Sequence, residues 1–227
     1  ALLGASIDFF FMRMLFKHVA SGPIRAIAPV VATLGLLGII RSAVGYIWGV
    51  EVKPLEPPVS TNGIRIGSEV LPFSTYDALI LLIVFVVLMI LTFIFQRTSL
   101  GLSLKASAFS PEISRLSGVR VDLTRTVGWA IAGACGAIAG VLATPTSLLS
   151  PNSLDILLVF GFVAAVIGGL ESMLGAVVGG IVLGLGVTFI ANYVGSTLVF
   201  LSAFIFLIII LLVKPAGLIS GKRSRNA

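Results

Sequence analysis

The chain has 227 residues, of which 58% are hydrophobic and only 11% are charged, and its formal net charge is +6. Soluble chains carry about 25% charged residues, so this composition excludes an ordinary soluble domain and indicates an integral membrane protein. The chain has a single cysteine, Cys135, and a single histidine, His18, which excludes an intramolecular disulfide and Cys/His zinc motifs. The basic residues are not clustered with aromatic residues, as nucleic-acid binding would require.

The first half of the chain predicts one partial and two complete membrane spans. Residues 1–16 form an apolar run interrupted by Asp8 and Arg13, which we interpret as the end of a span that begins outside this sequence. Residues 26–50 and 76–95 are each long enough to cross a hydrocarbon core of about 30 Å. A short basic link occupies 17–25. The polar, proline-rich loop 51–75 carries an alternation that predicts a small hairpin.

A polar segment, residues 96–125, interrupts the apolar pattern and contains a short helix with recognisable ends. Ser110 is a suitable N-cap, Pro111 stands at the first helical position, and Gly118 fits the position after the helix. Glu112 in the first turn and Arg115 near the last turn complement the helix dipole. We predict that Pro111 divides the helical path of this segment in two.

Apolar residues recur through the same segment at spacings of four, three, four and three, which places them on one face of a helical path. They are Leu102, Ala106, Phe109, Ile113 and Leu116. A short amphipathic helix of this kind suits docking into a groove on a partner, or lying flat on the membrane. The alternative is a basic loop that only fixes the topology.

The second half of the chain predicts four further spans, at 126–149, 154–170, 173–194 and 198–213, followed by a tail at 214–227. Alternate threading places 17–25, 96–125 and the tail on one side, which holds 12 of the 15 Lys and Arg residues when Arg13 is counted with it. The positive-inside rule makes that side cytoplasmic, C-terminus included, and 51–75 extracytoplasmic. The sequence thus predicts one all-α, polytopic permease-like domain over 1–227, with six complete spans and one partial span. A re-entrant element within 154–194 remains an alternative.

Glycines recur at four-residue spacing in the C-terminal spans, which indicates close helix packing in lipid. The repeats comprise Gly136 with Gly140, Gly175 with Gly179, and Gly180 with Gly184.

Signatures of catalysis are missing from the sequence, which contains no nucleotide-binding, HExxH or GxSxG motif. Charged groups within spans are costly and mark functional candidates. Arg41 and Glu171 stand first, with Asp8 and Asp155 behind them, although a snorkelling arginine and a solvated turn carboxylate explain the first two equally well. Candidates for a translocation path are Thr33, Arg41, Thr144 and Asn192, against the alternative that such polar side chains bond their own helices. No series of Asp, Glu or His runs through the spans, which argues against an ion-driven transporter.

Five segments together carry a family pattern. In order they read APVVATLG at 28–35, KASAFSPE followed by LSGV between 105 and 119, AGACGAIAGVL at 132–142, GGLESMLGAVVGG at 168–180 and KPAGL at 214–218. From about residue 25 to residue 221 the chain resembles the permease subunits of branched-chain amino acid ABC importers, the LivH-like family. Ser114 stands where this family usually has Ala, and Glu171 where it usually has Gly.

The resemblance implies a permease of a bacterial-type inner membrane that binds no cofactor itself. Its expected partners are a second permease subunit, two cytoplasmic ATPase subunits that hold the ATP, and an extracytoplasmic substrate-binding protein. The ATPases would dock on 110–118, with Phe109, Ile113 and Leu116 as apolar anchors. Alternatives are a sugar, nucleoside, amide or urea importer of related architecture, a channel or facilitator without an ATPase, and a structural membrane subunit.

Overall fold

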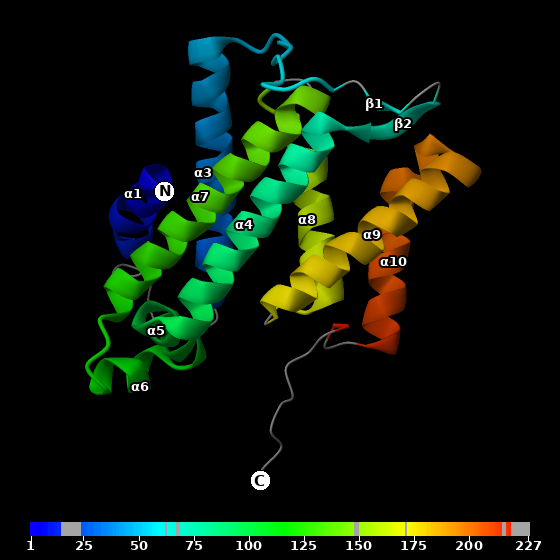
Figure 1. Cartoon of the computed structure of the whole chain (residues 1–227). Coiled ribbons are helices and arrows are strands. Elements are labelled where there is room, and N and C mark those ends of the chain that lie inside the picture. The colour runs from blue at the N-terminus through cyan, green and yellow to red at the C-terminus, as the bar shows by residue number, and fades with distance from the viewer. Residues whose placement is uncertain are drawn as a thin grey trace. The chain divides into compact units, whose positions relative to one another are not determined.

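The computed structural model describes residues 1–14, 24–61, 63–66, 69–147, 150–170, 172–214 and 217–218. Most of the predicted basic link, Glu171 and the tail beyond residue 218 lie outside the described residues. The chain divides into two compact units, Ala1–Ser153 and Leu154–Ala227, and each is described by itself. Both are helical, and one hairpin is the only sheet in the described ranges (Figure 1). The predicted helical class is confirmed; that both units form one permease domain stays a prediction.

The first unit is built from long helices and short polar connections. Its elements are α1 (Leu2–Ser6), the π-helical segment η1 (Ile7–Met12), α3 (Ile24–Trp48), β1 (Gly63–Ile66), β2 (Glu69–Ser74), α4 (Thr75–Arg97), α5 (Ser99–Phe109), α6 (Pro111–Leu116) and α7 (Val121–Ser147). The antiparallel strands β1 and β2 confirm the hairpin predicted in the loop. α4 starts with a capping box, in which the Ser74 hydroxyl accepts from the Asp77 amide and the Asp77 carboxylate accepts from the Ser74 amide.

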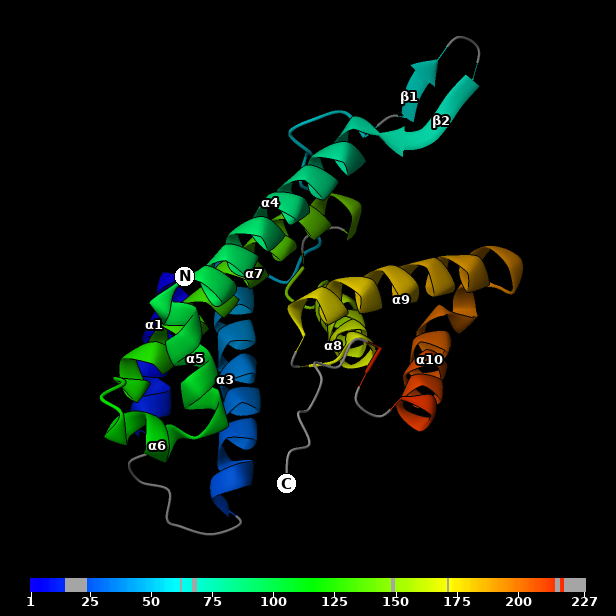
Figure 2. The same ribbon diagram turned by 60° about the horizontal axis from the view of Figure 1, so that its bottom comes forward.

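Helices α1, α4 and α5 pack against α7 or against one another (Figures 1 and 2). The Tyr76 side chain at the start of α4 is buried, and its hydroxyl donates to the Leu142 carbonyl at 2.8 Å. Gly4 lets α1 approach α7 closely, since a Cβ at that position would collide with the Trp129 carbonyl. The crossing brings the π-helical segment η1 alongside the beginning of α7.

The second unit is a hairpin of helices with a third helix against it. Its elements are α8 (Asp155–Gly168), α9 (Met173–Tyr193), the 3₁₀ turn η2 (Ser196–Leu198) and α10 (Val199–Val213). Its core consists of Val163, Ile167, Leu183 and Ala203, all of which are buried. α8 and α9 pack backbone to backbone at Gly168, Gly175 and Gly179, where any Cβ would collide with main-chain atoms of the facing helix.

Among the residues that the structure describes, five helices have the length and composition to cross a membrane. They cover Ala28–Trp48, Thr75–Arg97, Val121–Pro145, Met173–Tyr193 and Ser196–Val213. The predicted run 154–170 forms α8, whose 14 residues span about 21 Å at 1.5 Å per residue, less than a hydrocarbon core. It is short because a turn at 151–154 precedes it and Gly169, at φ +105°, ends it. Six complete spans are therefore not confirmed, and α8 is the difference.

Gly217 and Leu218 pack onto the turn between α8 and α9. The Leu218 amide donates to the Ile167 carbonyl at 2.8 Å, and Gly217 lies at φ +85° against Gly169. Two of the glycine-containing segments noted in the sequence, 168–180 and 214–218, thus meet in one place.

Gly217→Ala is expected to lower the thermal unfolding midpoint of the detergent-solubilised protein. The left-handed backbone costs a residue with a Cβ about 1–2 kcal/mol, and here the added Cβ also collides with the backbone of Gly169. Gly49→Ala is the matched control, because Gly49 has φ +84° and open space around it. The Gly49 variant measures the cost of the left-handed backbone alone, without a collision. Equal unfolding midpoints for the two variants would therefore contradict the packing role of Gly217.

Candidate functional site

The polar segment folds into two helices joined at Ser110. Ser110 has extended backbone angles (φ −151°, ψ 100°) and caps both helices: its amide donates to the Ala106 carbonyl of α5, and its hydroxyl accepts from the Ile113 amide of α6. Pro111 occupies the first position of α6, where its missing N–H is not needed. The predicted division of the helical path is confirmed.

The end of α6 has the predicted glycine. Gly118 lies at φ +82°, and its amide donates to the Arg115 carbonyl at 3.1 Å. The next amide, from Val119, donates to the Ser114 carbonyl at 3.0 Å. These two bonds form a Schellman motif, so α6 is closed at both ends by its own sequence.

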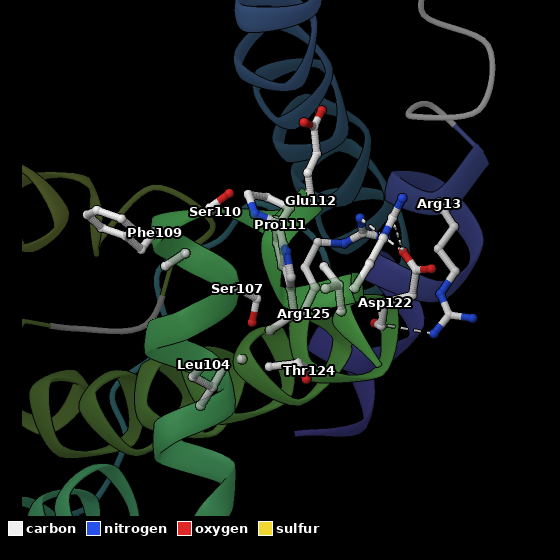
Figure 3. Close-up of a pocket in the computed structure, with 15 residues that line it drawn as sticks. Arg13, Leu104, Ser107, Phe109, Ser110, Pro111, Glu112, Asp122, Thr124 and Arg125 are labelled. Carbon is white, nitrogen blue, oxygen red and sulfur yellow. Dashed lines mark hydrogen bonds and ion pairs between the residues drawn. The ribbon is translucent and has the colours of Figure 1, made fainter. Parts of the chain in front are cut away.

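The apolar side chains of this segment lie on the surface of the chain. The exposed fractions are 93% for Phe109, 63% for Ile113 and 89% for Leu116. Figure 3 shows the Phe109 ring pointing away from Arg125 and Asp122. By contrast Ser114, on the inner side of α6, is buried. α6 therefore presents an apolar face that the first unit does not cover.

A cavity of about 1160 Å³ lies beneath α6, between α5 and the beginning of α7. Its lining combines apolar and charged side chains from α5, α6 and α7 with Ser110 between helices and Arg13 after η1 (Figure 3): Arg13, Leu104, Ser107, Ala108, Phe109, Ser110, Pro111, Glu112, Arg115, Val121, Asp122, Thr124, Arg125, Gly128 and Trp129. Five of the eight docking residues predicted from the sequence line this cavity, namely Phe109, Ser110, Pro111, Glu112 and Arg115, whereas Ile113, Leu116 and Gly118 do not. Within the described ranges, no three His, Cys, Asp or Glu side chains lie close enough together to hold a metal ion.

A buried ion pair stands behind this cavity. Asp8 of η1 is 0% exposed, and its carboxylate accepts from Arg125 Nε at 2.7 Å and from Thr126 Oγ1 at 2.6 Å. Arg13 Nη2 donates to the same Thr126 hydroxyl at 3.0 Å, and its guanidinium lies 4.7 Å from the centre of the Phe9 ring. A buried charge needs such partners, so this cluster fixes η1 to α7.

The polar contacts continue from the buried pair to α6. Asp122 Oδ1 lies 3.7 Å from Arg125 Nη1 and 3.5 Å from Arg115 Nη2. From the sequence, Asp8 is a weaker functional candidate than Arg41 and Glu171. Asp8 and Arg125 are 117 residues apart, and the only signal in the sequence was their opposite charge, Asp8 within the apolar run 1–16 and Arg125 at the end of the polar segment.

Three of the four candidate path residues bond their own helices. Thr33 donates to the Val30 carbonyl of α3, Thr144 to the Gly140 carbonyl of α7, and Asn192 to the Thr188 carbonyl of α9. Arg41 lies in α3, and Asn192 belongs to the second unit. Their role in a path stays a prediction.

Five of the six glycines predicted to pack fall into two groups, and for Gly140 packing stays a prediction. Gly175 and Gly179 of α9 lie directly against α8, whereas Gly136, Gly180 and Gly184 have open space where a Cβ would stand. The structure brings the first group into a helix interface and leaves the second facing outward from its own unit.

Comparison with known proteins places the chain in a family. The family model described as "Branched-chain amino acid transport system / permease component" matches residues 19–213. The chain is 28% identical to a probable branched-chain amino acid transport permease protein LivH of Methanocaldococcus jannaschii, over 93% of this chain and 69% of the relative. It is 27% identical to the high-affinity permease protein BraD of Pseudomonas aeruginosa and 26% identical to LivH of Escherichia coli (strain K12), each over 89% of this chain and 68% of the relative.

No solved structure matches the chain. The family match covers most of both units, including the polar segment 96–125 and the segment 168–180. The chain belongs to the family of permease components of branched-chain amino acid transport systems.

Proposed function

We propose that this permease is a membrane subunit of an ATP-driven importer that moves branched-chain amino acids into the cytoplasm. The substrate class rests on the relatives, which are named as branched-chain amino acid transport permeases. The observation that carries the ATP-driven part is the apolar face of α6 with Phe109, which a capped helix exposes beside a cavity. A surface of three large apolar side chains on a charged segment has the chemistry of a site that a partner protein covers.

The partner on this face would be a cytoplasmic ATPase subunit. A helix that inserts apolar anchors into a groove binds through a few buried side chains, and Phe109, Ile113 and Leu116 supply them. With a second permease subunit, the assembly would carry two such ATPases, and an extracytoplasmic protein would deliver substrate. ATP would bind to the ATPase subunits and not to this chain.

The proposed topology places α6 and the C-terminus in the cytoplasm of a cell with a bacterial-type inner membrane. The charge distribution supports it, since 12 of the 15 Lys and Arg residues fall on that side. We propose that α8, paired with α9 along its length, acts as a shortened crossing. This keeps the six complete spans and one partial span that the alternation of loops requires.

Transport would proceed by alternating access, with ATP-driven movement of the partner transmitted through 110–118. The caps at both ends of α6 support this, because they satisfy the backbone groups at its ends and so stabilise the helix that would receive the movement. The long helices α4 and α7, which flank the segment in sequence, would then carry the movement into the membrane.

Reconstitution of the full-length permease with its ATPase subunits and binding protein tests the proposal. We expect labelled leucine to enter vesicles only when ATP and the binding protein are both present. Leucine uptake that is indifferent to ATP would identify a facilitator and contradict the docking role of 110–118. ATP hydrolysis that responds to the binding protein without leucine movement would leave the ATP-driven mechanism in place and overturn the substrate class.

A further inference from the structure

A series of four charged side chains connects α6 to the N-terminal helix. Arg115 on α6 faces Asp122 at 3.5 Å, Asp122 faces Arg125 at 3.7 Å, and Arg125 bonds Asp8 at 2.7 Å. We call these four residues the charge series. It begins on the helix where a partner would dock and ends on η1.

The two halves of the charge series differ in burial. Asp8 is 0% exposed and the Arg125 side chain 27%, whereas Arg115 and Asp122 are 61% and 55% exposed. A buried pair is held firmly, because breaking it leaves an uncompensated charge in a poorly solvated place. An exposed pair is screened by water and ions and forms or breaks easily. η1 and α7 are thus locked together, while the connection to α6 can open.

Asp122 connects the buried pair, Asp8 with Arg125, to the exposed Arg115 on α6. Its carboxylate stands between two guanidinium groups, and both distances exceed the 2.7–2.9 Å typical of a closed charge-assisted bond. A shift of α6 toward or away from α7 would therefore decide which arginine the carboxylate approaches. Arg13 holds the same turn from the other side through the Asp122 carbonyl at 3.5 Å.

We propose that Asp122 is a positioning residue that couples movement of α6 to the α7–η1 pair, by exchanging its carboxylate between Arg115 and Arg125. The proposal rests on the proposed function, because it takes α6 as the place where the ATPase docks. When α6 is drawn toward the partner, Asp122 loses Arg115 and closes on Arg125, whose other side is bound to Asp8. The arrangement of η1 against α7 thereby depends on the position of α6.

The test uses the complete transporter with Asp122→Asn in the permease. Three quantities are measured: the thermal unfolding midpoint of the permease, co-purification of the ATPase, and the number of leucine molecules imported per ATP hydrolysed. The first two should be unchanged, because Asp122 is exposed and lies outside the apolar face. The third should fall at least about 5-fold, the lower end of typical coupling between distant sites. Asp122→Glu, which keeps the charge, should restore it.

Arg120→Gln is the matched control, since Arg120 is an exposed arginine in the same turn that does not belong to the charge series. It should leave all three quantities at the wild-type level. Asp8→Asn is the second variant: it should lower the unfolding midpoint and also the import per ATP. If Asp8→Asn lowers the unfolding midpoint but leaves import per ATP unchanged, then the Asp8–Arg125 pair does not take part in the coupling.

Three results separate the possible failures. Wild-type import per ATP in Asp122→Asn would overturn the proposal and leave the proposed function standing. Loss of the ATPase from Asp122→Asn would also overturn it, by making Asp122 a docking contact. Absence of ATP-dependent import in the wild-type transporter would contradict the proposed function itself, and this proposal with it.

Discussion

Phe109→Asp is expected to remove the ATPase subunits from the purified transporter and to abolish ATP-dependent uptake, while the permease still inserts and unfolds at its wild-type temperature. The ring is 93% exposed in the isolated chain, and exposed substitutions away from packed features change stability by about 0.5 kcal/mol or less. Against a partner, however, an aromatic anchor typically contributes about 2–4 kcal/mol, which corresponds to a loss of affinity of roughly 30-fold to 1000-fold. Co-purification and uptake in vesicles measure the two consequences.

Leu123→Asp provides the control for this prediction. Leu123 is 53% exposed in the first turn of α7 and lies outside the apolar face of α6 and the cavity lining. It should therefore retain both the ATPase and uptake. If the double variant Phe109→Asp/Leu116→Asp also keeps the ATPase bound, then the apolar face of α6 is not the docking surface.

The double variant Gly175→Ala/Gly179→Ala is expected to lower the free energy of unfolding more than any other change in the second unit. A Cβ on Gly175 would collide with the Gly168 carbonyl, and one on Gly179 with the Ala164 carbonyl. Because backbone atoms of two packed helices cannot yield as a flexible side chain can, α8 and α9 must separate. Overpacking of this kind costs about 1–3 kcal/mol per site. Calorimetric unfolding in detergent measures the loss.

Gly180→Ala/Gly184→Ala is the matched control on the same helix, with open space at both positions. In the isolated permease this pair should be neutral or slightly stabilising, since Ala is favoured over Gly in a helix by about 1 kcal/mol. Equal destabilisation by the two double variants would contradict the division of the glycines into packed and open groups.

Local features of this protein were determined by the sequence alone. The boundaries of α6 follow from Ser110, Pro111 and Gly118, because caps and helix stops involve atoms only a few residues apart. The long apolar helices follow from run length, since each span must satisfy its own backbone in lipid. The hairpin between β1 and β2 is local in the same sense. The spacing also predicted one face for Phe109, Ile113 and Leu116. Ser110 interrupts the helix between Phe109 at the end of α5 and the other two residues on α6, so that shared face stays a prediction.

Which residues meet across the chain was decided only by the tertiary structure. The pairing of Asp8 with Arg125 depends on α1 crossing α7 at Gly4. The charges of both residues can be read from the sequence, but the crossing that brings them together cannot. The four-residue spacing is identical at Gly175 with Gly179 and at Gly180 with Gly184, yet only the first pair faces α8. Helix periodicity fixes which residues share a face, but the neighbour that covers the face is chosen by packing between distant segments.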